Sequence, residues 1–291
     1  MQFLPVEECM NKDVCFDDFF DDYKKKIRIG VKGRLRRDFL EMDLSAVIPT
    51  YGSGNLTILD AGGGAGERSI AAAKKGHLVT LADISEKMLG EAKHDAAASG
   101  VFDKITFCRC PLQDFSMPNG PEWDIIFLHG VLAWLAEPVH ALRSIAAKVK
   151  SGGFISILYY NRDALIFKTA VSGGLAVFQK SKFRGNGKNL TPINPLTMDH
   201  INDAIDPAKF QVVHKRGIRI FADYFLSKEN ISRVDSGINT NAVPDSSETY
   251  QEIFDIEKEY SLREPFASLG RHVHIIFKKI VQKNSIKESW A

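Results

Sequence analysis

Residues 56–67 read Leu-Thr-Ile-Leu-Asp-Ala-Gly-Gly-Gly-Ala-Gly-Glu, and this stretch predicts a strand, a tight turn and the start of a helix. The aliphatic run that ends at Leu59 is typical of a short buried strand, and it stops abruptly at an acid and several glycines. Glycine permits backbone conformations and close approaches that a Cβ would prevent. An apolar, Ala-rich helix is expected over 69–73, and the free N–H groups at its N-terminus suit an anionic group.

Two acidic residues strengthen the prediction of a ligand at this turn. Asp60 ends the first strand directly before the glycines, and Asp83 ends a second predicted strand, 77–82. An acid about 20 residues beyond the loop is expected to bind ribose hydroxyls, so a nucleoside cofactor is predicted. The spacing fits the G-x-G-x-x-G of dinucleotide oxidoreductases poorly. With Gly62, Gly63 and Gly64 it instead resembles motif I of class I S-adenosylmethionine-dependent methyltransferases, in which a carboxylate lies near the methionine amino group.

Length and composition restrict the class of protein. The chain has 291 residues, 44% hydrophobic and 25% charged, with a formal net charge of +2. These values allow one elaborated domain or two small ones, and the net charge alone gives no sign of nucleic acid. The four cysteines lack paired ligand spacing, so no metal is predicted. No apolar run approaches the ~18 residues that span a bilayer, and the acidic N-terminus is unlike a signal peptide. We expect a cytoplasmic protein without membrane contact.

Strands and helices alternate after the glycine loop. A helix is predicted over 85–98 with Ser85 as its N-terminal cap, and further strands are predicted at 105–108, 123–128, 154–160, 210–213 with 218–221, and 272–277. Continuous apolar strands that alternate with helices indicate a parallel sheet covered on both faces. The pattern fits the α/β, Rossmann-like fold of class I methyltransferases, a mostly parallel seven-stranded sheet whose last strand is antiparallel. Ligands bind at the carboxyl ends of such strands, which here include Leu112, Gln113 and His129.

Five segments are expected along the chain. Residues 1–50 form a helical segment that closes over the cofactor, and 51–162 form the cofactor-binding core. Residues 210–280 complete the same sheet, and 281–291 form a tail. Residues 163–209 are expected to be a basic insertion outside the sheet that contacts the substrate.

Two stretches, 24–37 and 164–198, contain basic residues and no acid. Unopposed positive charge suits a phosphate backbone, although a basic run is often only a solvated face. Together the two stretches favour a polyanionic partner. The residues predicted to contact nucleic acid are Lys180, Lys182, Arg184 and Lys188.

Six stretches occur in an order that resembles the family of bacterial tRNA 5-carboxymethoxyuridine methyltransferases, which form the methyl ester of uridine 5-oxyacetic acid at the wobble position. They are 32–36, 59–64, 129–138, 159–161, 217–224 and 269–274, and the similarity runs from about residue 16 to 278. The resemblance implies a tRNA anticodon stem-loop as partner and S-adenosylmethionine as cofactor. It implies cofactor contacts at Arg36, Gly62, Gly63, Asp83, Leu112 and His129, to which we add Asp60, Gly64 and Gln113 from their positions at the strand ends.

The reaction of that family needs no general base, because a carboxylate is already ionised at neutral pH. Catalysis would come mainly from alignment, a contribution that reaches ~7–11 kcal/mol. The substrate carboxylate still needs donors, and the candidates are Tyr160, Asn161, Arg219 and Arg271, each of which could instead be structural. His129 is expected to be a wall of the cofactor pocket rather than a base.

Three alternatives stay open from the sequence. The first is a methyltransferase that acts on a small-molecule carboxylate, with the basic stretches merely solvated. The second transfers a carboxymethyl group from carboxy-S-adenosylmethionine, with Arg36 facing the added carboxylate. The third is a non-catalytic tRNA-binding protein that holds the cofactor for stability.

Overall fold

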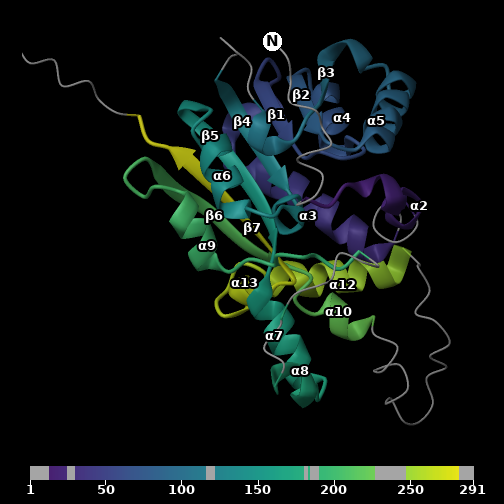
Figure 1. Ribbon diagram of the computed structural model, residues 1–291, viewed down its shortest axis with the longest axis vertical. Helices are drawn as coiled ribbons and strands as arrows, with labels where there is room; N and C mark the ends of the chain where they lie inside the picture. Colours follow the sequence, from purple (N-terminus) through teal and green to yellow (C-terminus); the bar gives the residue numbers. More distant parts are fainter. Residues whose placement is uncertain are drawn as a thin grey trace, which may run out of the picture.

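A computed structural model describes residues 13–24, 30–115, 122–179, 183, 190–226 and 247–281. Its centre is a seven-stranded sheet with the order β3-β2-β1-β4-β5-β7-β6 (Figure 1). The strands are β1 (Thr57–Ala61), β2 (Leu78–Asp83), β3 (Ile105–Arg109), β4 (Trp123–His129), β5 (Val149–Tyr160), β6 (Phe210–Ile218) and β7 (His272–Lys279).

The last strand, β7, runs antiparallel to both of its neighbours, β5 and β6, and the other pairs are parallel. The predicted fold is therefore confirmed. One detail differs, because β6 is a single strand from Phe210 to Ile218 with a register shift between Val212 and His214, and it stops before 219–221. Arg219 has a φ of +60°, which ends the extended conformation there.

Helices cover both faces of the sheet. On one face α3 (Val31–Val47), α4 (Glu67–Lys74) and α5 (Glu86–Ala98) pack over a cluster that includes Ile58 and Phe127. On the other, α6 (Pro138–Ala146) and α9 (Met198–Ala204) pack over a cluster that includes Leu59 and Leu128. Adjacent strand residues thus face opposite sides, as a pleated sheet requires. Ser85 caps α5 as predicted, since its hydroxyl accepts a hydrogen bond from the Met88 N–H.

The segment 163–209 divides into two parts. α7 (Arg162–Val171) and α8 (Leu175–Gln179) project from the body at the bottom of Figure 1. Residues 196–205, in contrast, belong to the core, because Leu196, Ile201 and Ile205 are buried against the sheet. Only part of the predicted insertion therefore lies outside the fold. The four predicted nucleic-acid contacts in it fall outside the described residues.

The remaining helices precede α3 or lie in the connections between these elements. Short helices in the N-terminal and central parts of the chain are η1 (Phe16–Phe19), α2 (Phe20–Tyr23), η3 (Pro49–Gly52), η4 (Phe102–Lys104), η5 (Leu112–Asp114) and η6 (Leu132–Trp134). The C-terminal third adds α10 (Ala222–Phe225), α12 (Ser247–Tyr260) and α13 (Phe266–Leu269). Within the described part of the chain, no helix has the length and apolar character needed to cross a membrane.

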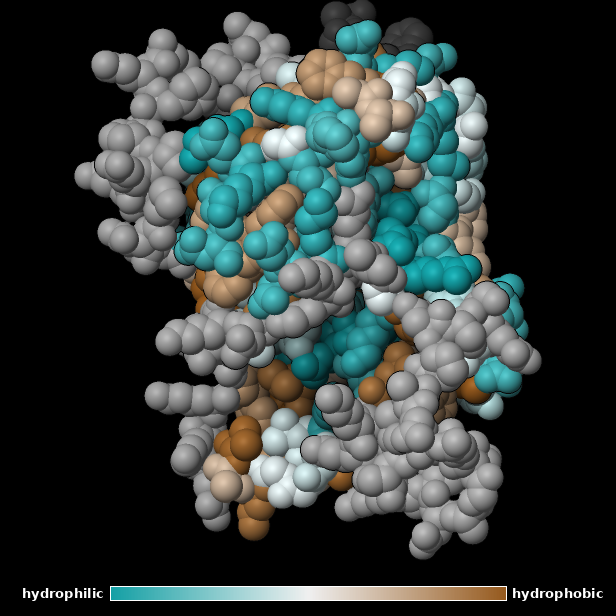
Figure 2. All heavy atoms as spheres, turned by 90° about the vertical axis from the view of Figure 1, so that its right-hand side faces the viewer, coloured by the Kyte–Doolittle hydropathy of each residue, from teal (hydrophilic) through white to brown (hydrophobic). Residues whose placement is uncertain are grey.

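The right-hand side of the molecule in Figure 1 carries a hollow at mid-height (Figure 2). Hydrophilic side chains lie at the bottom of this hollow, and hydrophobic side chains border it below. The upper part of the same face is predominantly hydrophilic.

Candidate cofactor and substrate site

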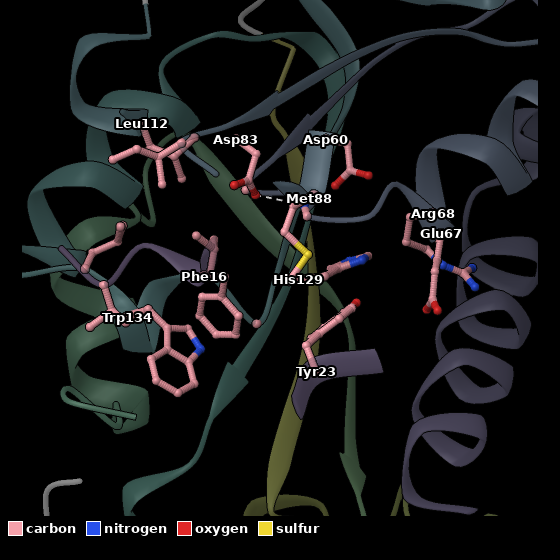
Figure 3. A pocket seen from close by; sticks show the side chains of 18 of the residues that line it. Phe16, Tyr23, Asp60, Glu67, Arg68, Asp83, Met88, Leu112, His129 and Trp134 are labelled. Atoms are coloured by element: carbon pink, nitrogen blue, oxygen red, sulfur yellow. Dashed lines mark hydrogen bonds between the residues drawn. The ribbon is translucent and has the colours of Figure 1, made fainter. Parts of the chain in front are cut away.

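A pocket opens where β1, β2 and β4 end, and the glycine loop forms one of its walls (Figure 3). A Cβ on Gly64 would meet only the Met88 sulfur, at 4.0 Å, so the loop presents open backbone at this point. At Gly63 a Cβ would lie 2.5 Å from the Asp60 carboxyl carbon. The absence of side chains therefore lets the loop approach both a ligand and the strand-ending acid.

Two carboxylates, the buried Asp60 and the partly buried Asp83, face this pocket from adjacent strands. Asp83 accepts hydrogen bonds from the N–H groups of Gly64 and Ser85, each at 2.8 Å, and burial raises its pKa. Asp60 accepts a 2.7 Å bond from the Ser69 hydroxyl, and burial raises its pKa to about 6. Carboxylates in such surroundings gain from a cationic or hydroxyl donor. They suit the ammonium and ribose groups of a nucleoside-type cofactor.

His129, at the end of β4, adds an acceptor to the same pocket. Its Nε2 atom lies 2.8 Å from the Ser156 hydroxyl, while its Nδ1 atom is buried without a hydrogen-bond partner among the described residues. Burial, together with the neighbouring His274 and two arginines, holds its pKa well below the usual range. A neutral imidazole with one unused nitrogen is unsuited to an empty cavity, since a buried polar atom needs a partner. A bound ligand would supply that partner.

The N-terminal segment lies across the pocket. Phe16 and Tyr23 line it, and Phe16 packs edge-on against Trp134 with ring centroids 4.8 Å apart (Figure 3). Asp13 accepts a 2.8 Å bond from the Ala136 N–H, and Asp17 accepts a 3.0 Å bond from the Lys87 N–H. Residues 13–24 are thus tied to both sides of the opening, and the closure of residues 1–50 over a cofactor stays a prediction.

Most of the predicted cofactor residues meet at this one pocket. It is lined by Arg36, Asp60, Gly62, Gly63, Gly64, Asp83, Leu112 and His129. Gln113 is absent from the lining, and its side-chain N–H donates to Asp13 at 2.7 Å, so it holds the N-terminal segment. Arg36 lines the pocket near Glu67, whose charge acts on its guanidinium.

A second group of side chains surrounds Asp223 on α10. The Arg219 Nε atom donates to its carboxylate at 3.0 Å, the Lys32 Nζ atom lies at 3.4 Å and the Arg271 Nε atom at 3.7 Å. Burial alone would raise the pKa of Asp223, but Arg219 and Lys32 lower it far below its usual range. The Arg271 guanidinium also lies over the Tyr160 ring, 4.5 Å from its centroid. We name this group the cationic cluster: Lys32, Tyr160, Arg219, Asp223 and Arg271.

Asn161 has a different role from the one predicted. Its amide NH₂ donates to the carbonyls of Ser268 and Gly270, at 2.8 and 3.0 Å, and its oxygen caps α7 at the Asp163 N–H. Both amide hydrogens are therefore in use, and none is left for a substrate carboxylate. The residue instead holds the 268–270 loop that precedes Arg271.

The prediction from sequence missed several residues of both groups. Phe16, Tyr23 and Trp134 line the pocket, and Lys32 and Asp223 belong to the cationic cluster. The only available signal for Lys32 was its position one helical turn before Arg36. Asp223 has one local partner, Arg219 four residues earlier, but its partners Lys32 and Arg271 come from distant parts of the chain.

The sheet order, the antiparallel last strand and this pocket define a class I S-adenosylmethionine-dependent methyltransferase. Residues 58–153 match the family model described as a methyltransferase domain. A tRNA 5-carboxymethoxyuridine methyltransferase of Escherichia coli K12 is 30% identical over 275 residues, covering 94% of this chain and 100% of the relative. The chain belongs to the family of tRNA 5-carboxymethoxyuridine methyltransferases.

Two further matches cover less of the chain or show the fold alone. A ubiquinone biosynthesis O-methyltransferase of Vibrio vulnificus is 29% identical over 116 residues, 40% of this chain and 48% of the relative. The solved structure of magnesium protoporphyrin IX methyltransferase from Synechocystis with bound SAH has a TM-score of 0.57 at 15% identity, covering 91% of this chain and 96% of that one. As a member of this family, the chain described here uses S-adenosylmethionine as its cofactor.

Proposed function

We propose that this enzyme methylates the carboxylate of 5-carboxymethoxyuridine at the wobble position of tRNA and so forms the methyl ester. The observation that supports this most directly is the cationic cluster. It holds three cations, Lys32, Arg219 and Arg271, around the single carboxylate of Asp223. The excess of positive charge would favour one further anion.

The unpartnered nitrogens of Arg271 support the binding of a substrate carboxylate in particular. Its Nε and Nη1 atoms are buried without a hydrogen-bond partner among the described residues, although the guanidinium is close to Asp223. Buried donors without partners are costly, and a carboxylate oxygen is a strong acceptor for a guanidinium N–H. A substrate carboxylate would satisfy this requirement.

The cationic cluster lies beside the cofactor pocket. Lys32 reaches the cluster and Arg36 lines the pocket, and the two residues are one turn apart on α3. Tyr160 ends β5, the strand next to β4, which ends in His129. A substrate group held by the cluster would therefore lie close to the reactive end of a bound cofactor.

The chain itself has little proton chemistry to perform. When bound, the cofactor supplies a sulfonium methyl group that a carboxylate oxygen takes as the carbon–sulfur bond breaks. The substrate carboxylate is already ionised at neutral pH, so no base is required. Arg219 and Arg271 would orient the substrate carboxylate, and the Tyr160 ring would support the Arg271 guanidinium that lies over it. Alignment of the reacting atoms would supply most of the rate enhancement. Lys180, Lys182, Arg184 and Lys188 remain our proposed contacts to the tRNA backbone.

Mass spectrometry of wobble uridines tests the proposal. We expect tRNA from cells that lack this gene to lose the methyl ester and accumulate the free 5-oxyacetic acid, and re-expression to restore the ester. An unchanged ester in the deletion strain would contradict the proposal. Re-expression of Arg271→Ala should restore less of the ester than the wild type does, whereas Arg263→Ala, a change at a mostly exposed arginine on the C-terminal side of α12, should restore it fully.

The main alternative is methylation of a small-molecule carboxylate. In that case the purified enzyme would turn over small acids and bind tRNA without specificity. Binding of a tRNA backbone should weaken steeply with salt, because phosphate contacts release counterions. A substrate-dependent turnover that is insensitive to salt would favour the small-acid reaction.

A further inference from the structure

A series of hydrogen bonds connects the cofactor pocket to the buried side of helix α3. From the pocket, His129 Nε2 lies 2.8 Å from the Ser156 hydroxyl, and that hydroxyl lies 2.8 Å from His274 Nε2. The other nitrogen of His274, Nδ1, lies 2.8 Å from an oxygen of Asp43. Ser156, His274 and Asp43 are almost completely buried. The four residues come from β4, β5, β7 and α3, so the series crosses the sheet.

The direction of every hydrogen bond in this series follows from the Asp43 carboxylate at its inner end. An ionised carboxylate only accepts, so His274 Nδ1 must carry the hydrogen. Burial keeps His274 neutral, which makes its Nε2 atom an acceptor for the Ser156 hydroxyl hydrogen. The Ser156 oxygen then accepts from His129, whose hydrogen must be on Nε2. The remaining nitrogen of His129, Nδ1, is left as an acceptor.

We propose that Asp43, Ser156 and His274 are positioning residues that fix His129 in the Nε2–H tautomer and so present its Nδ1 lone pair to the cofactor pocket. Nδ1 is the buried atom that has no partner among the described residues. The bound cofactor carries an ammonium group, a donor that suits an acceptor in this wall. The inference rests on His129 contacting the cofactor, as proposed from its place in the pocket.

Arg216 fixes the orientation of the inner end. Its Nε atom donates to the other Asp43 oxygen at 2.8 Å, and its guanidinium also contacts the Ser261 hydroxyl. His214 lies 2.9 Å from the oxygen that accepts from His274. Burial alone would raise the pKa of Asp43, but the two histidines keep it far below its usual range. The carboxylate is thus held ionised with one oxygen assigned to Arg216 and one to His274.

Because of this orientation, Asp43→Asn should reverse the direction of each hydrogen bond from residue 43 to His129, which gives a test of the proposal. Arg216 requires the amide oxygen, so the amide NH₂ must face His274. His274 would then become the Nε2–H tautomer, the Ser156 hydroxyl would turn to donate to His129, and His129 would carry its hydrogen on Nδ1. The side-chain ¹⁵N spectrum of histidine-labelled protein without cofactor, assigned with His129→Gln, distinguishes the two tautomers. An unchanged Nε2–H signature of His129 in Asp43→Asn would overturn the proposal.

Cofactor affinity gives the second readout. Asp43→Asn places a donor opposite the cofactor ammonium, and we expect the dissociation constant for S-adenosylmethionine to rise roughly 10- to 100-fold. Ser156→Ala interrupts the series, so it should leave His129 as a mixture of tautomers. In the Ser156→Ala background, Asp43→Asn should cause no further change at His129. Effects that simply add would contradict transmission through Ser156.

The matched control is Asp124→Asn. This carboxylate also accepts hydrogen bonds, from Thr57 and Lys150, but it lies at the opposite end of β4. Its substitution should leave the His129 spectrum and the cofactor affinity unchanged. If Asp43→Asn does not fold, Ser156→Ala carries the test, and a pure Nε2–H tautomer in that variant would refute the proposal. The tautomer is measured without substrate, so a correct tautomer with failed methylation would point to the proposed function instead.

Discussion

Arg271 is the residue whose surroundings most need a ligand, since two of its buried nitrogens have no hydrogen-bond partner within the described ranges. We expect Arg271→Ala to lower kcat/KM for the tRNA substrate roughly 10- to 100-fold, because a hydrogen bond to a charged group contributes ~1.5–3 kcal/mol. The affinity for S-adenosylmethionine should be unchanged. Steady-state kinetics and calorimetry with the cofactor separate the two effects. Unchanged turnover would remove Arg271 from the site.

Gly63 is the second residue whose neighbours allow a sharp test. A Cβ there would lie 2.5 Å from the Asp60 carboxyl carbon, and the Ser69 hydroxyl holds that carboxylate in place. We therefore expect Gly63→Ala to shift the loop and weaken cofactor binding at least about tenfold, equivalent to ~1.4 kcal/mol. Calorimetric titration with S-adenosylmethionine measures the change. Gly90→Ala on α5 is the control, since a Cβ there meets nothing within 4 Å and alanine favours the helix. Equal affinities in the two variants would contradict the prediction.

At the scale of elements, α12 positions the loop that carries Arg219. Glu257 on α12 is buried and accepts 2.9 Å hydrogen bonds from three consecutive N–H groups, those of residues 220–222. These bonds follow the positive φ of Arg219, a conformation that costs ~1–3 kcal/mol outside glycine. The loop needs this anchor because Arg219 and Asp223 flank it.

We expect Glu257→Gln to lower the free energy of unfolding by ~1–3 kcal/mol, since its amide NH₂ would face a backbone N–H. Turnover should fall with it, while cofactor affinity is retained. Urea unfolding and single-turnover assays measure the two effects. Glu252→Gln, an exposed change on the same helix, should alter neither. A fully stable, active Glu257→Gln would show that α12 does not position the loop.

For the whole molecule, the features that could be predicted from the sequence are those with a local signal, namely the periodicity of the strands and the residues that follow them. The strands that carry Asp60, Asp83 and His129 at or near their carboxyl ends were predicted, and these residues line one pocket because parallel strands bring those ends to one edge. Long-range partners had no local signal. β6 is continuous because β7 pairs along its length, and Asp43 meets His274 across 231 positions of the chain. The core position of residues 196–205 was also missed, because their basic surroundings suggested an exposed insertion.

The free energy of unfolding should depend on pH in part through the ionisation of Asp60. Its pKa rises from 3.8 to about 6 on folding, mainly through burial. A carboxyl group whose pKa is higher in the folded state than in the unfolded state stabilises the fold at pH values below its unfolded-state pKa. This contribution is lost as the pH rises through its folded-state pKa. Asp43 and Asp223 have lowered pKa values and act with the opposite sign, so their stabilisation is lost as the pH falls.

Comparison with Asp60→Asn isolates this contribution, because Asp43 and Asp223 are common to both proteins. Between pH 4 and pH 7 the cofactor-free wild type should lose up to about 3 kcal/mol relative to the variant, at 1.36 kcal/mol per pKa unit. Urea unfolding at intervals of pH gives the difference in free energy of unfolding. Asp124→Asn provides the opposite sign, since the pKa of Asp124 is lowered on folding: the wild-type advantage over that variant should shrink at acid pH. A difference between wild type and Asp60→Asn that does not change with pH would mean that Asp60 has the same pKa in the folded and unfolded states, so that burial does not oppose its ionisation. Its proposed place opposite the cofactor ammonium would then lose its electrostatic basis.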